Sequence, residues 1–151
     1  MKRIPLPTFR RIVFFSALYD LLLTAPFATP WSFVLVQSQL GAVNQALGGG
    51  PLPPFEGFHL LLANLMGSIV VVWSALRLRH PEPLLGRYDG MARFLFSGWM
   101  AWTLHATGQP VLWLFVVPEL AWGVVQWWPL SGSAALQLSA PPLRQTPTPA
   151  R

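Results

Sequence analysis

The feature that most constrains this chain is the apolar segment at residues 110–128, which reads PVLWLFVVPELAWGVVQWW. At a rise of about 1.5 Å per residue, a helix of this length crosses the hydrocarbon core of a membrane. Its one ionisable residue, Glu119, lies near the middle. Because a charged group at that depth is costly in lipid, we expect Glu119 to face protein or water and to have a partner.

The composition places the rest of the chain in a bilayer as well. Of 151 residues, 53% are hydrophobic and 10% are charged, whereas roughly a quarter of the residues of a soluble domain are charged. The net charge of +5 comes from basic residues that flank the apolar segments, a pattern typical of membrane topology and not of nucleic-acid binding. The chain has no cysteine, which excludes disulfides, thiol catalysis and cysteine-ligated metal sites.

Four apolar segments predict an all-α bundle of four transmembrane helices, at residues 12–27, 55–78, 86–107 and 110–128. They form one domain over residues 1–128. Residues 31–47 are amphipathic without a basic face, which predicts a helix lying along the outer membrane interface. Residues 129–151 are rich in Pro, Ser, Thr and Gln and predict a disordered cytoplasmic tail. The first segment also has features of a secretory signal peptide, but Asp20 within it and Pro26 before the candidate cleavage site argue against cleavage.

The distribution of basic residues predicts the orientation. Four lysines and arginines lie near the N-terminus, three lie at residues 77–87 and two lie in the tail, while the connections at 26–54 and 108–110 have none. By the positive-inside rule both termini are cytoplasmic. The excess of arginine over lysine suggests a bacterial source, and therefore the bacterial inner membrane. In size and number of spans the chain is similar to small bacterial families such as the DoxX-like group, but no motif extends this resemblance and we assign no family.

Each predicted span has a stripe of small and polar residues, as helices that pack together in lipid do. By the helical rise, Asp20, Arg93 and Glu119 lie roughly 9 to 13 Å from the inner ends of their spans. We therefore expect one inner-to-middle layer in which two carboxylates share one guanidinium. Asn64 and Ser97 belong to the same polar stripes and complete the predicted site.

Two interpretations of this layer remain open. It is a proton or ligand site if one carboxylate is incompletely compensated, because such a group in lipid favours its neutral form. Alternatively it only fixes how the helices pack, with Arg93 paired to Asp89 at i, i+4 and with Asp20 and Glu119 bonded to polar neighbours.

A second candidate site lies toward the outer ends of the spans. Glu56 and His59 have the i, i+3 spacing of the Glu-x-x-His pairs in di-metal bundles, and His105 falls at a similar depth. Such sites need more carboxylates than this region has, so these three are weak metal ligands and we expect no metal, haem or quinone. Three tryptophans nearby would line a pocket for a flat ligand such as a quinone: Trp99, Trp102 and Trp113.

The sequence predicts an accessory subunit, a binding module or a small carrier for a proton or a hydrophobic ligand. No GxSxG, HExxH or phosphate-binding glycine loop occurs, so no catalytic residue is assigned. The first alternative is a membrane oxidoreductase, or a quinone- or haem-associated protein, that uses the outer histidines. The second is a purely structural subunit. The expected partners are the lipid bilayer and either further copies of the chain or a membrane complex, and not nucleic acid.

Overall fold

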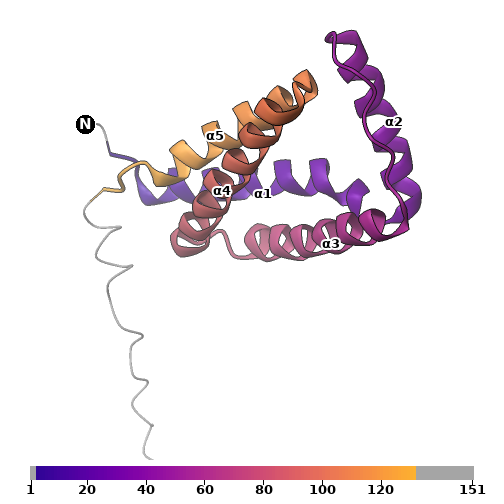
Figure 1. The fold of residues 1–151 in the computed structure, drawn as a ribbon. Helices are drawn as coiled ribbons and strands as arrows, with labels where there is room; N and C mark the ends of the chain where they lie inside the picture. Colours follow the sequence, from indigo (N-terminus) through magenta and orange to yellow (C-terminus); the bar gives the residue numbers. More distant parts are fainter. Residues whose placement is uncertain (1–2, 132–151) are drawn as a thin grey trace, which may run out of the picture.

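The structure is a computed structural model that describes residues 3–131, and this part of the chain is helical. Residues 3–131 form five α-helices, and their arrangement is shown in Figure 1. In chain order the elements are α1 (Leu6–Thr24), the 3-10 helix η1 (Ala25–Ala28), α2 (Pro30–Ala46), α3 (Gly57–Arg79), α4 (Pro83–Thr107), the 3-10 helix η2 (Pro110–Leu112) and α5 (Trp113–Trp127). Of the predicted tail at 129–151, residues 132–151 lie outside the described part.

Three helical segments among residues 3–131 are long and apolar enough to cross a membrane: Leu6–Ala28, Gly57–Arg79 and Pro110–Trp127. The predicted span at 86–107 corresponds to α4, which has 25 residues but is less apolar because it contains Arg87, Asp89 and Arg93. The first helix begins at Leu6, earlier than the predicted residue 12. Pro7 lies in its first turn, where a missing N–H breaks no helical hydrogen bond.

The helices form two pairs joined by α2. Figure 1 shows α1 and α3 side by side, with the α4–α5 hairpin inclined to them. The first pair packs closely where α1 ends and η1 begins, because a Cβ on Gly67 of α3 would lie 2.5 Å from the carbonyl carbon of Phe27 in η1. Only glycine permits this approach of helix to backbone. Likewise, a Cβ on Gly86 of α4 would lie 2.5 Å from Val13 Cγ2 of α1.

Asn44 joins the end of α2 to the turn between α4 and α5. Its fully buried side chain donates to Gly50 O at 2.7 Å and to Gln109 Oε1 at 2.5 Å, and accepts from Val111 N at 3.0 Å. α2 therefore connects the C-terminal end of α1 to the tip of the α4–α5 hairpin, at a steep angle to α1 and α3 (Figure 1).

The two ends of the described chain lie together. Ile4 N donates to Pro129 O at 2.9 Å, and Ser131 N donates to Ile4 O at 3.0 Å. Beside this pairing, Phe9, Val13 and Leu130 form a small apolar core. The N-terminus of α1 and the C-terminus of α5 are thus held on the same side of the molecule.

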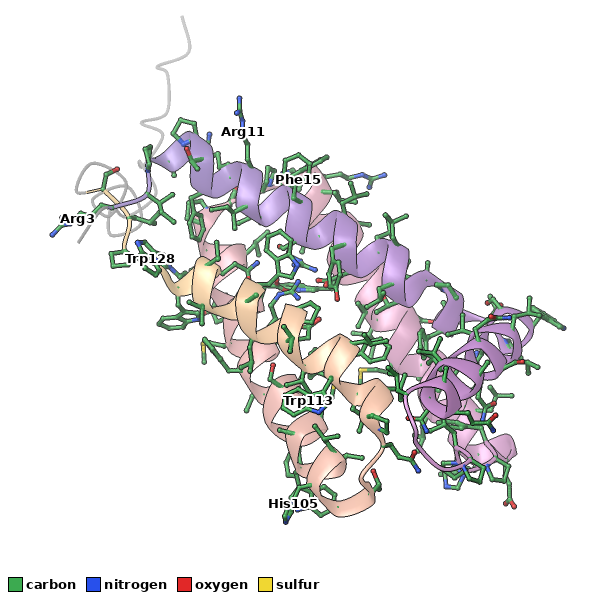
Figure 2. All side chains as sticks on the ribbon, turned by 90° about the horizontal axis from the view of Figure 1, so that it is seen from above. Arg3, Arg11, Phe15, His105, Trp113 and Trp128 are labelled. Atoms are coloured by element: carbon green, nitrogen blue, oxygen red, sulfur yellow. The ribbon has the colours of Figure 1, made fainter. Side chains whose placement is uncertain are left out.

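Polar and charged residues make up much of the buried interior, while large apolar side chains point outward. Phe15 on α1 and Trp113 on α5 are each more than half exposed (Figure 2). The buried polar residues are Ser16, Asp20, Asn44, Ser74, Arg77, Asp89, Arg93, Ser97 and Gln126. This distribution suits a protein solvated by lipid, in which apolar surface gains little by burial.

Candidate functional site

Arg93 of α4 contacts three carboxylates from three helices. Its Nη2 donates to Asp20 Oδ2 of α1 at 2.6 Å, its Nε to Asp89 Oδ2 of α4 at 3.0 Å, and its Nη1 to Glu119 Oε2 of α5 at 2.8 Å. The Arg93 side chain is 2% exposed. The guanidinium therefore makes both the contact with Asp20 and Glu119 and the i, i+4 pair with Asp89 that the sequence analysis treated as alternatives.

A second guanidinium, that of Arg77 on α3, is fully buried beside the first. Its Nη2 donates to Asp20 Oδ2 at 2.5 Å, and its Nη1 lies 2.5 Å from Asp89 Oδ2. Arg77 was predicted to be a basic residue at the end of its span, and its burial between the helices corrects that expectation. No local pattern in the sequence marks this burial; in the structure Trp73, one turn earlier on α3, also reaches the site, and its Nε1 donates to Asp89 Oδ1 at 3.0 Å.

We call these five residues the charged cluster: Asp20, Arg77, Asp89, Arg93 and Glu119. Uncharged groups complete it, since Gln126 Nε2 donates to both Asp89 Oδ2 and Ser16 Oγ at 2.8 Å. Ser16 lies one turn from Asp20 on α1, so both face the same side of the helix. The cluster thus joins α1, α3, α4 and α5 at one level.

Ser97 and Asn64 do not hydrogen-bond to the charged cluster. The buried Ser97 hydroxyl and both amide atoms of Asn64 have no hydrogen-bond partner within the described residues. Helical side chains point toward the helix N-terminus, so the guanidinium of Arg93 reaches back to Asp89 and away from Ser97. Asn64 lies roughly 20 Å along α3 from Arg77. Their place in a ligand site remains a prediction.

The three residues of the outer candidate site are exposed and are not brought together. Glu56 precedes α3, and His59 packs against Phe55 with ring centroids 6.4 Å apart. His105 lies near the far tip of α4 (Figure 2). Across residues 3–131, no group of three or more His, Cys, Asp or Glu residues is placed to hold a metal ion. Glu56, His59 and His105 thus do not form one group in the described part of the chain, and the oxidoreductase alternative stays a prediction.

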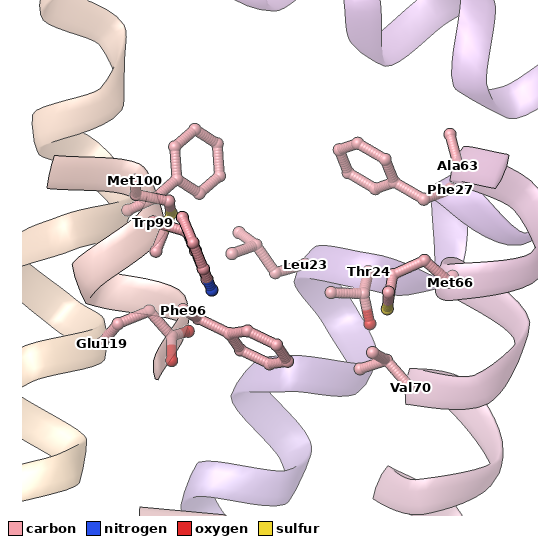
Figure 3. Close-up of a pocket in the computed structure, with 12 residues that line it drawn as sticks. Leu23, Thr24, Phe27, Ala63, Met66, Val70, Phe96, Trp99, Met100 and Glu119 are labelled. Carbon is pink, nitrogen blue, oxygen red and sulfur yellow. The ribbon is translucent and has the colours of Figure 1, made fainter. Parts of the chain in front are cut away.

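An apolar pocket of about 380 Å³ lies beside the charged cluster, between the first helix pair and the α4–α5 hairpin. Figure 3 shows Glu119, Phe96 and Trp99 along one side and Phe27 and Ala63 on the other. A smaller pocket of about 250 Å³ shares Glu119 and Phe96 with it and is also lined by Asp20, Asp89 and Arg93 of the cluster.

One of the three tryptophans expected to line a pocket does so. Trp99, although 69% exposed overall, lines the larger pocket, whereas Trp102 and Trp113 do not. Bulky side chains elsewhere on the wall come from α1 and α3, including Leu23, Met66 and Val70. Sequence spacing alone gave no sign of these positions, because their apolar side chains resemble those that face lipid.

No protein family, no curated protein and no solved structure matches this chain. The function is therefore argued from the charged cluster and the pocket beside it.

Proposed function

We propose that the chain is an inner-membrane protein with four spans and both termini in the cytoplasm. Three apolar helices supply three of these spans, and α4 is the fourth because its buried charges are satisfied within the bundle. The pairing of Ile4 with Leu130 supports an even number of crossings. Arg10 and Arg11 at the N-terminal end support its cytoplasmic location. In this arrangement α2 lies across the outer ends of the spans.

Within that topology, we propose that the protein is a binding module or small carrier for a largely apolar small molecule. The observation that carries this proposal is the pocket of about 380 Å³. Ligand sites are typically apolar cavities of about 300 to 1,000 Å³ with a few polar groups that fix orientation. Here the polar group is Glu119, whose side chain is 13% exposed.

The position of the pocket favours entry of the ligand from the membrane. α3 packs on α1 and η1, while α4 packs on α5. The pocket receives Met66 and Val70 from α3 and Phe96 and Trp99 from α4, so it lies where the two helix pairs face each other. An apolar molecule dissolved in the lipid reaches it without crossing water. A purely structural cluster needs no such space, because protein interiors otherwise contain few voids larger than water.

The test is to fill the pocket and measure binding of a neutral apolar probe, 2-(1-naphthyl)ethanol. Val70→Trp places an indole in the pocket, whereas Val72→Trp makes the same change two residues along α3, where the side chain is 71% exposed. With protein in phosphatidylcholine nanodiscs, we expect saturable binding that Val70→Trp weakens by about tenfold or more. Val72→Trp is expected to bind like the wild type. Equal binding by both variants would contradict the proposal.

A further inference from the structure

The charged cluster is not neutral when all its members are ionised. It contains three carboxylates, Asp20, Asp89 and Glu119, and two guanidiniums, Arg77 and Arg93, joined by five ion pairs. The balance is therefore one net negative charge in a site whose side chains are at most 13% exposed. Because uncompensated charge is costly within a membrane, the cluster favours one additional positive charge, either a proton or a cation.

Glu119 is the carboxylate that can receive this charge. Asp20 Oδ2 accepts from both guanidiniums, and the two oxygens of Asp89 together contact Trp73, Arg77, Arg93 and Gln126.

Glu119, by contrast, has one hydrogen-bond donor among the described residues, Arg93, which contacts Oε2. It is also the only carboxylate of the cluster that lines the larger pocket. A cation that enters this pocket therefore meets Glu119 first.

The rest of the pocket suits the body of a hydrophobic cation. Phe96 and Trp99 lie beside Glu119 (Figure 3), and aromatic faces attract a cation close to them. The farther wall is apolar, with Leu23, Phe27 and Met66. Since the larger pocket has one acidic side chain, it matches a ligand with one positive charge.

We propose that the pocket binds a lipophilic monoamine, with its ammonium group on the Glu119 carboxylate and its apolar body against Phe96 and Trp99. This inference rests on the proposed function, because it specifies the ligand class of the same pocket. The ammonium replaces a proton on Glu119 that balances the cluster when the pocket is empty. Binding of the protonated amine therefore releases one proton, and the two cations compete.

The other charged and titratable side chains around Glu119 do not remove the competition between the proton and the ammonium group. Arg93 and Asp89 face it from α4, Asp20 and Tyr19 from α1, and Arg77 lies behind them on α3. The two arginines are already shared among the carboxylates. The Tyr19 ring packs against Trp122, with ring centroids 6.2 Å apart.

The experiment compares two probes that differ only in their polar group, 2-(1-naphthyl)ethylamine and 2-(1-naphthyl)ethanol. Calorimetry in phosphatidylcholine nanodiscs measures the affinity of each, and repeating it in buffers of different ionisation enthalpy counts the protons released. We expect the wild type to favour the amine by about tenfold or more near pH 8, and this ratio to fall toward one near about pH 5. An alkyl amine stays protonated over this range. About one proton should be released per amine bound.

Glu119→Gln is expected to bring the ratio of amine to alcohol affinity close to one at every pH. The matched control is Glu56→Gln, which changes an exposed glutamate outside the pocket and should keep the wild-type ratio. If Glu119→Gln fails to fold, the pH dependence and proton release of the wild type test the inference without it.

Two results separate the possible failures. In the first, Val70→Trp weakens the binding of both probes, but the wild type either does not favour the amine or favours it without releasing a proton. This result overturns the monoamine inference and leaves the proposed binding module standing. If Val70→Trp changes binding of neither probe, the proposed function itself is wrong.

Discussion

Replacement of Arg77 by methionine tests whether the charged cluster holds the bundle together. Methionine keeps most of the length and apolar surface of the side chain while removing its charge. Removing one partner of a buried ion pair typically costs about 3 to 5 kcal/mol. Arg77 contacts both Asp20 and Asp89, but each of these also contacts Arg93. Because Arg93 still compensates them in part, we expect Arg77→Met to lower the free energy of unfolding by about 3 kcal/mol, the lower end of this range.

The measurement is equilibrium unfolding in mixed micelles with increasing SDS, followed by circular dichroism. Arg79→Met is the control, because it makes the same substitution on the same helix at an exposed position and should change stability by less than about 0.5 kcal/mol. Adding Asp20→Asn to Arg77→Met returns the cluster to one net negative charge, and we expect it to restore about 1 to 2 kcal/mol. If Arg77→Met and Arg79→Met unfold at the same SDS fraction, Arg77 is not part of a buried cluster and the reasoning fails.

Three further predictions concern packing and topology. Gly67→Ala should destabilise the protein by about 1 to 3 kcal/mol through overpacking against η1. Gly98→Ala is the control, because a Cβ there meets nothing within 4 Å, and it should be neutral or stabilising by up to about 1 kcal/mol. Similar SDS midpoints for the two variants would contradict the close approach of α3 to η1. Asn44→Ala should speed hydrogen exchange at the backbone amide of Val111, because this amide loses its acceptor, Asn44 Oδ1. Gln45→Ala, at an exposed position, should leave the exchange rate unchanged. Equal exchange rates in the two variants would mean that α2 is not joined to this turn. Since the chain has no cysteine, a membrane-impermeant maleimide should label Gln45→Cys only in right-side-out vesicles and Glu82→Cys only in inside-out vesicles, and the reverse pattern would invert the proposed topology.

The helices were largely predictable because the pattern that defines them is local. Apolar runs of spanning length bounded by Pro and Gly gave the positions of α3 and α5 to within a few residues. The amphipathic segment at 31–47 corresponds to α2 (Pro30–Ala46). The start of α1 was placed too late because Pro7 reads as an interruption in the sequence, although proline fits the first turn of a helix. The contact of Asn44 with the turn before α5 joins residues distant in sequence, and no local pattern indicates it.

Depth along each helix was sufficient to predict that Asp20, Arg93 and Glu119 lie at one level, and the structure places them in contact. Depth was not sufficient for Arg77. An arginine near the end of a span either lies outside the membrane, where it indicates topology, or is buried as a counter-ion between helices. The helix face that meets the neighbouring helix decides between these two roles. In the structure α3 packs through Gly67 against η1 and buries Arg77, and the sequence does not reveal which faces of α3 make these contacts.

Structural and binding roles for the cluster are compatible because its members differ in how firmly they are held. Asp20 and Asp89 each contact both guanidiniums, so with Arg77 and Arg93 they form a neutral group of two acids and two bases. That group joins α1, α3 and α4, and it stays balanced whatever happens at Glu119. Glu119 has one contact to this group and faces the pocket, so a proton or a ligand can exchange there without breaking the contacts that hold the helices. Arg93 of this neutral group is thus a fixed positive partner for Glu119. Glu119 is the one carboxylate of the cluster at which a proton can be replaced by the ammonium of the proposed ligand.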